Sequence, residues 1–163
     1  MKKLSALIIS ALLFTGMLGL NTGAAAAEQK NQTLVSQTTE YFEDGSSVII
    51  SVYEDDMPAT RAGTFTKSGS KTYTMKNNSG KKLWSFTLNG SFSVNSGVSS
   101  SCTSSSYSSK IEDDAWSLKT ASAVKSGNKA VGDATYQAKF LFIVTDTKSC
   151  HIELKCDVNG NLS

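Results

Sequence analysis

The stretch KLWSFTLNGSFSVN, residues 82–95, alternates between apolar and polar side chains from Trp84 onward. From there serine, threonine and asparagine fill the odd positions, Gly90 keeps the phase, and the large apolar residues occupy the other even positions: Trp84, Phe86, Leu88, Phe92 and Val94. A period of two places each set of side chains on one face of a β-strand. The stretch therefore predicts a long strand with one buried face, over which other strands pack.

Similar segments lie on both sides of this strand, with turn residues about every ten positions. The predicted strands are 33–42, 47–53, 70–76, 82–95, 97–109, a short one around 116–119, 135–145 and 150–158. The Ser-rich segment 97–109 is also typical of a linker, but we favour a polar strand with Cys102 pointing inward. No helical period follows residue 27. The pattern predicts a single all-β sandwich, immunoglobulin-like, with about eight antiparallel strands.

The segment 135–145 is apolar on both of its faces. Phe140 shares its parity with aliphatic neighbours, as Trp84 and Trp116 do, so we expect these three aromatic side chains in the core rather than in a sugar-binding platform. Leu141 and Ile143 lie on the opposite face, which is either buried as well or forms an exposed patch. Together with Tyr107, the aromatic residue with the freest position, Leu141 and Ile143 are the candidate binding patch.

The first 27 residues have the three parts of a secretory signal peptide. Lys2 and Lys3 form a basic start, residues 4–20 are apolar, and the alanine cluster supplies the small residues that precede a cut after Ala27. A membrane-anchoring helix is the alternative, but the short apolar run and the alanines favour cleavage. We therefore expect an extracellular protein with a mature chain of 136 residues and no further membrane span.

The charges of the mature chain separate along the sequence. Residues 28–60 carry a formal charge of −6 and residues 61–163 one of +6. Pro58 and Arg61, the only proline and the only arginine, lie at this boundary. One hypothesis is that a protease cuts the linker at Arg61 and removes an acidic hairpin that masks a basic β-sandwich body. We favour the alternative that 28–163 is one domain, in which 28–60 supplies integral strands whose acids pair with nearby lysines.

The three cysteines are Cys102, Cys150 and Cys156. Export is compatible with a disulfide, and an odd number leaves one thiol over. Cys150 and Cys156 lie six residues apart on one predicted strand, about 20 Å if it is straight. A disulfide needs Cα atoms within about 7 Å, so Cys102 must be one partner of any bond. Spacing does not choose between Cys150 and Cys156 as the other.

Four short motifs resemble a group of small secreted proteins of Gram-positive gut anaerobes. They are KSGSK at 67–71, Leu83-Trp84, Cys102-Thr103 and the ending KCDVNGNLS at 155–163, and the resemblance covers most of the mature chain. Members of the group tend to have cysteines at the positions that match Cys102 and Cys156. The resemblance therefore implies a Cys102–Cys156 disulfide with Cys150 free, and it implies no activity.

Few residues point to catalysis or to metal binding. His151, the only histidine, follows Cys150, but neighbours on a strand point to opposite faces, so we expect a solvent-facing histidine and no Cys–His dyad. The acidic clusters 54–56 and 112–114 are compatible with calcium ligands or with paired acids for glycoside cleavage, but we favour solvated turns. Residues 157–161 are similar to half of a calcium loop. We expect no cofactor and no metal.

The leading functional interpretation is a secreted, non-catalytic binding or surface-interaction module. Its expected partner is a cell-wall polymer, a glycan or a surface protein of a host or bacterial cell, and not a nucleic acid. The alternative is a basic effector, bacteriocin-like or wall-binding, that is unmasked by proteolysis at Arg61. An enzyme is disfavoured because no part of the sequence gathers convergent polar groups.

Overall fold

The computed structural model describes residues 31–56 and 63–163. Within these ranges the chain forms eight strands, and no helix there is long and apolar enough to cross a membrane. The predicted signal peptide with its cut after Ala27, and the linker with Pro58 and Arg61, lie outside the described residues. The strands are β1 (Gln32–Tyr41), β2 (Ser47–Asp55), β3 (Thr64–Lys76), β4 (Lys82–Asn95), β5 (Ser99–Ile111), β6 (Trp116–Ser126), β7 (Lys129–Phe140) and β8 (Ile143–Lys155).

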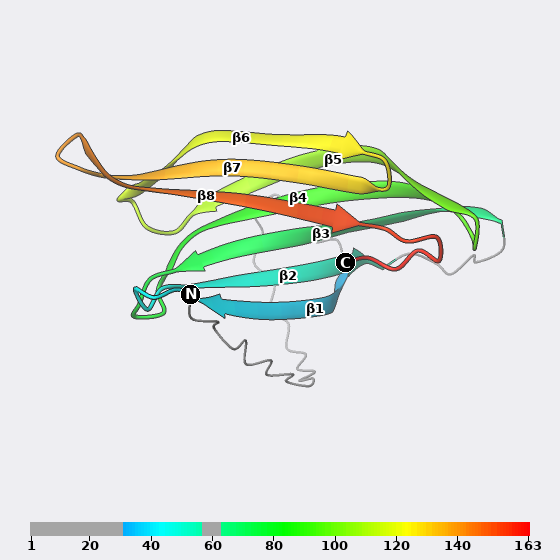
Figure 1. The fold of residues 1–163 in the computed structure, drawn as a ribbon, viewed down its shortest axis with the longest axis horizontal. Helices are drawn as coiled ribbons and strands as arrows, with labels where there is room; N and C mark the ends of the chain where they lie inside the picture. The colour runs from blue at the N-terminus through cyan, green and yellow to red at the C-terminus, as the bar shows by residue number, and fades with distance from the viewer. Residues whose placement is uncertain (1–30, 57–62) are drawn as a thin grey trace, which may run out of the picture.

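Two antiparallel sheets stack on each other (Figure 1). The first has the order β1-β2-β3-β4-β5 and the second the order β6-β7-β8, so paired strands always follow one another in sequence. The chain changes sheet once, through residues 112–115. The prediction of an all-β protein with eight antiparallel strands is confirmed. The strand order differs from that of the immunoglobulin fold, whose Greek-key connections cross repeatedly between the sheets, so the immunoglobulin-like part of the prediction does not match this topology.

The core lies under β4, as the alternation predicted. The five large apolar side chains at even positions of β4, from Trp84 to Val94, are fully buried. The Trp84 ring stacks with Tyr73 of β3 and with Tyr136 of β7, at centroid distances of 5.7 and 3.8 Å. Burial of each large apolar side chain contributes about 1.5–3 kcal/mol relative to exposure. The inner face of β4 is therefore the surface on which the two sheets meet.

Gly132 of β7 lets the two sheets approach closely at the centre of the core. A Cβ atom at this position would lie 2.8 Å from Phe86 Cε1 and 3.1 Å from Leu88 Cδ1. Both distances are shorter than ordinary van der Waals contact between carbon atoms. A side chain at residue 132 would therefore push the aromatic ring or the second sheet away.

The second sheet covers only part of the first. β7 and β8 lie against β3, β4 and β5, whereas β1 is exposed along its whole length. β2 still buries Val48 and Val52, and it pairs with β3 from Ser47 to Glu54. Glu54 and Asp55 therefore lie on a paired strand of the five-stranded sheet, whereas Glu43 and Asp44 lie in the turn between β1 and β2.

The structure determines the secondary structure of two segments, 97–109, for which two interpretations were open, and 135–145, for which the predicted strand is wrong. The Ser-rich segment forms β5, and Cys102 packs against the core from it, which confirms the strand interpretation. The prediction of one strand over 135–145 is wrong, because the chain reverses at Leu141 and Phe142. Residues 146–149, which separate the predicted strands 135–145 and 150–158, lie within β8.

Candidate functional site

The hairpin that joins β7 to β8 ends in five consecutive apolar residues that are all exposed to solvent. They are Phe140, Leu141, Phe142, Ile143 and Val144, with exposed fractions of 68, 74, 99, 69 and 46%. We call these five residues the apolar tip. Figure 1 shows it as the orange loop that extends past the ends of the other strands. Single exposed apolar residues are common in proteins, but a contiguous group marks an interaction surface.

The backbone of the apolar tip is in an unfavourable conformation for its sequence. Leu141 and Phe142 form a two-residue turn between the paired residues Phe140 and Ile143, and their φ angles are +47° and +70°. A type I′ turn needs positive φ at both positions, and Asn-Gly is its usual sequence. Other L residues lose about 1–2 kcal/mol each in this region. Such a conflict between backbone and side chain is concentrated at functional segments.

Tyr136 shows how far the apolar tip projects. Its ring stacks on Trp84 near the start of β4, and its hydroxyl donates to the Ser85 carbonyl oxygen at 3.2 Å while lying 2.7 Å from Ser109 Oγ. Burial raises the pKa of Tyr136 to about 12, although the Ser109 hydrogen bond lowers it. Phe140 lies four residues further along β7, about 13 Å away. The tip therefore begins beyond the end of the five-stranded sheet.

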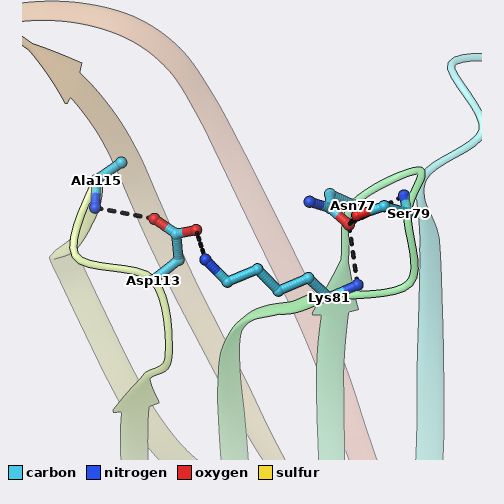
Figure 2. Close-up of polar contacts among 5 residues, drawn as sticks. All are labelled: Asn77, Ser79, Lys81, Asp113 and Ala115. Carbon is cyan, nitrogen blue, oxygen red and sulfur yellow. Dashed lines mark hydrogen bonds and ion pairs between the residues drawn. The ribbon is translucent and has the colours of Figure 1, made fainter.

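The base of the apolar tip is attached to the turn between β5 and β6. The Lys139 N–H group donates to the Ala115 carbonyl oxygen at 2.9 Å. The Asp113 carboxylate accepts from the Ala115 N–H group at 3.0 Å and from Lys81 Nζ at 2.7 Å (Figure 2). This bond from Lys81 lowers the pKa of Asp113. Within the turn between β3 and β4, Asn77 accepts from the backbone N–H group of Lys81 at 2.9 Å (Figure 2). The base of the tip is therefore linked to the β5–β6 turn, and that turn is linked to the β3–β4 turn.

Other acids near the base of the tip are also paired with lysines. Glu112 lies 2.7 Å from Lys110 Nζ, and Lys148 Nζ lies 3.7 Å from Asp146 and 3.8 Å from Asp44. In the acidic turn at 112–114, which we predicted to be solvated, Glu112 and Asp113 each have a lysine partner. In the described ranges no three His, Cys, Asp or Glu side chains are grouped in a way that could hold a metal ion.

The other acidic segments are engaged in local contacts. Glu54 forms an ion pair with Lys67 of β3. Near the C-terminus, Asp157 accepts hydrogen bonds from the backbone N–H groups of Asn159 and Asn161, both at 2.8 Å. The side chain of Asn161 donates a further bond and makes the largest contribution to the lowered pKa of Asp157. The loop that is similar to half of a calcium site is therefore closed by its own backbone.

His151 is exposed on the outer face of the three-stranded sheet, as predicted. Its Nδ1 atom lies 2.7 Å from Asp133 Oδ1 on β7, whereas Cys150 is buried on the opposite face. The two neighbours therefore cannot act as a Cys–His dyad. His151 also borders an open groove of about 450 Å³ between β8 and the first sheet, together with Ile50 and Lys71. Burial lowers the pKa of Lys71.

All three cysteines are thiols in the structure, so the disulfide that the resemblance implied is not formed there. Cys102 and Cys156 nevertheless converge on the turn between β6 and β7. The Cys102 N–H group donates to the Gly127 carbonyl oxygen at 2.8 Å, and the Cys156 N–H group donates to the Asn128 carbonyl oxygen at 3.1 Å. Cys150 lies further back on β8, where burial raises its pKa to about 12.

The candidate binding patch predicted from the sequence is divided by the fold. Leu141 and Ile143 belong to the apolar tip, but Tyr107 does not. Tyr107 lies on β5 with 43% of its surface exposed, and its ring stacks on Phe86 at 5.6 Å. Only the two aliphatic residues therefore remain in the candidate site.

Sequence reasoning missed the two aromatic residues of the tip. The prediction that Phe140 packs in the core is wrong, because β6 begins at Trp116 opposite Ala138 and no strand continues over Phe140. Phe142 has the same parity as Phe140, so a single strand over 135–145 would place both aromatic side chains on one face. The available signal was the run of five apolar residues without one polar side chain.

No protein-family model, curated protein or solved structure matches this chain.

Proposed function

We propose that the protein is an exported, non-catalytic binding module that contacts the surface of its target through the apolar tip. The observation that carries this proposal is the exposure of five consecutive apolar side chains around a turn with two positive φ angles. A turn chosen for stability alone would have Asn-Gly at these positions. The leader-like N-terminus supports export, because it has the parts of a signal peptide.

The tip supplies binding energy without any catalytic group. Phe140, Leu141, Phe142 and Ile143 each keep at least 68% of their surface exposed, so most of their transfer energy is still available. At about 1.5–3 kcal/mol per fully buried side chain, the gross gain is about 4–9 kcal/mol. Association costs at least about 4 kcal/mol in lost motional freedom. One tip therefore supports weak and reversible attachment.

Co-sedimentation with intact cells tests this function. The variant Leu141→Asn/Phe142→Gly removes the apolar turn residues, and Val98→Ser removes a 70% exposed apolar residue elsewhere. We expect the wild type and Val98→Ser to sediment with Gram-positive or mammalian cells, while the tip variant stays in the supernatant. The proposal fails if the tip variant sediments as well as the wild type. It also fails if the wild type sediments with neither kind of cell.

The second candidate function is a basic effector released by cleavage at Arg61, and this cleavage would remove stabilising contacts from the first sheet. Release of residues 28–60 would remove β2, which buries Val48 and Val52 and holds the Glu54–Lys67 ion pair. These contacts favour the uncleaved chain. N-terminal sequencing of the exported protein distinguishes the two: a start near residue 28 favours the binding module, and a start after Arg61 favours the effector.

We also propose that Cys102 and Cys156 form a disulfide after export, with Cys150 left as a thiol. The support is that the backbone N–H groups of these two cysteines donate to the carbonyl oxygens of consecutive residues, Gly127 and Asn128. In addition, the Ser100 hydroxyl donates to the Cys156 carbonyl oxygen at 3.0 Å. With oxidised glutathione, one thiolate attacks the small disulfide and the other thiolate resolves the mixed disulfide, so two molecules of glutathione are released. Cys150→Ala should still form the bond, as intact-mass analysis with alkylation can measure. A bond that depends on Cys150 would contradict this assignment.

A further inference from the structure

We infer that the target of the apolar tip is the interfacial region of a lipid bilayer, into which the tip inserts while the sheets remain in water. This inference rests on the proposed function and names the class of target for the same site. Residues 140–144 contain no polar side chain. Protein interfaces carry about one hydrogen bond per 100–200 Å², whereas hydrocarbon offers no hydrogen-bonding partner. The composition of the tip therefore favours lipid over a protein pocket.

The apolar tip has the dimensions of an interfacial anchor. Leu141 and Phe142 form its outermost level, Phe140 and Ile143 pair at the next, and Val144 pairs with Lys139 at the third. With a rise of about 3.4 Å per residue, the three levels span about 7–10 Å. For comparison, amphipathic helices that lie in the membrane interface bury their apolar faces by about 5–10 Å. Full insertion would therefore bring Lys139 to the headgroups, where its long side chain can keep the ammonium group in water.

The charges below the tip determine which lipids it should bind. Asp113 pairs with Lys81, Glu112 with Lys110 and Asp146 with Lys148. Because the acid and the lysine of each pair compensate one another, these three pairs add no net positive charge that would recognise anionic lipids. Binding should therefore depend on apolar contact, and it should occur on zwitterionic lipid and change little with salt.

Sedimentation with phosphatidylcholine vesicles tests the inference directly. We expect the wild type and Val98→Ser to bind, and we expect Leu141→Asn/Phe142→Gly to partition at least about tenfold less. Addition of phosphatidylglycerol, or a rise in salt from about 0.1 to 0.5 M, should change the partition coefficient of the wild type by less than about threefold. Binding that requires phosphatidylglycerol would overturn the inference.

A fluorescent reporter tests the depth of insertion. Phe142 is 99% exposed, whereas Trp84 is fully buried and Trp116 half-buried. The difference between the spectra of Phe142→Trp and of the parent protein should therefore report the environment of the introduced indole. We expect a blue shift on phosphatidylcholine vesicles and quenching by lipids brominated in the acyl chain. A spectrum unchanged by vesicles that bind the protein would contradict insertion through the tip.

The outcomes separate the inference from the proposed function. If the wild type ignores vesicles but still sediments with cells through the tip, the function stands and the target is a protein or a polysaccharide. If the tip variant binds vesicles as well as the wild type, the lipid inference fails. Tip-dependent dimerisation in lipid-free solution, measured by analytical ultracentrifugation, would also overturn it by identifying a second copy as the occupant.

Discussion

Replacing the apolar turn by Asn-Gly should make the protein more stable while it removes the proposed binding surface. Leu141 and Phe142 have positive φ angles, which cost about 1–2 kcal/mol each for ordinary L residues. Glycine removes this cost at the second position and asparagine reduces it at the first. Little packing is lost, because the two side chains are already 74 and 99% exposed. Against this stands the entropy of the added glycine, about 0.5–1 kcal/mol.

The net expectation for Leu141→Asn/Phe142→Gly is a gain of about 1–2 kcal/mol in the free energy of unfolding. Urea denaturation followed by tryptophan fluorescence measures it, since Trp84 lies in the core. The control is Leu141→Ser/Phe142→Ser, which removes the apolar groups but keeps two ordinary L residues in the turn, and it should stay within about 0.5 kcal/mol of the wild type. Equal or lower stability of the Asn-Gly variant would refute the idea that the tip is strained.

Two further predictions concern the core. Gly132→Ala should lower the free energy of unfolding by about 1–3 kcal/mol, because the added Cβ would press on Phe86. The control Ser122→Ala, at an exposed position of β6, should leave the free energy of unfolding unchanged in the same urea assay. Equal effects of the two substitutions would contradict the close approach of the two sheets at Gly132. At high pH, the unfolded chain loses protons from Cys150 and Tyr136 near their ordinary pKa values of 9.0 and 10.0, whereas the folded chain keeps them to about 12. Stability should therefore be complete below about pH 8 and fall as the pH rises towards 12. Cys150→Ala should reduce the loss of stability between about pH 9 and 11. If the urea midpoint of this variant falls with pH as steeply as that of the wild type, the loss does not come from Cys150.

The sequence by itself determined the faces of most strands. Alternation along β4 identified Trp84, Phe86 and Leu88 as core residues, and all three are fully buried. It also separated the buried Cys150 from the exposed His151 on β8. These predictions succeed because side-chain direction in a strand is a local property that depends only on parity. The turn at Gly45, whose φ angle is +79°, is local in the same sense, because the Asp-Gly pair by itself favours positive φ at the glycine.

Tertiary structure alone decided where the apolar tip lies and that it is exposed. Parity placed Phe140 in the core, but burial depends on where neighbouring strands stop, and β6 begins opposite Ala138. The chain reverses at Leu141 and Phe142, where the sequence has no glycine or asparagine to indicate a turn. The position of the turn is therefore determined only by the pairing of β7 with β8. Convergence of Cys102 and Cys156 on one turn is likewise a long-range contact. Local pattern sets which way a side chain points, whereas the extent of the covering sheet sets whether anything is there to bury it.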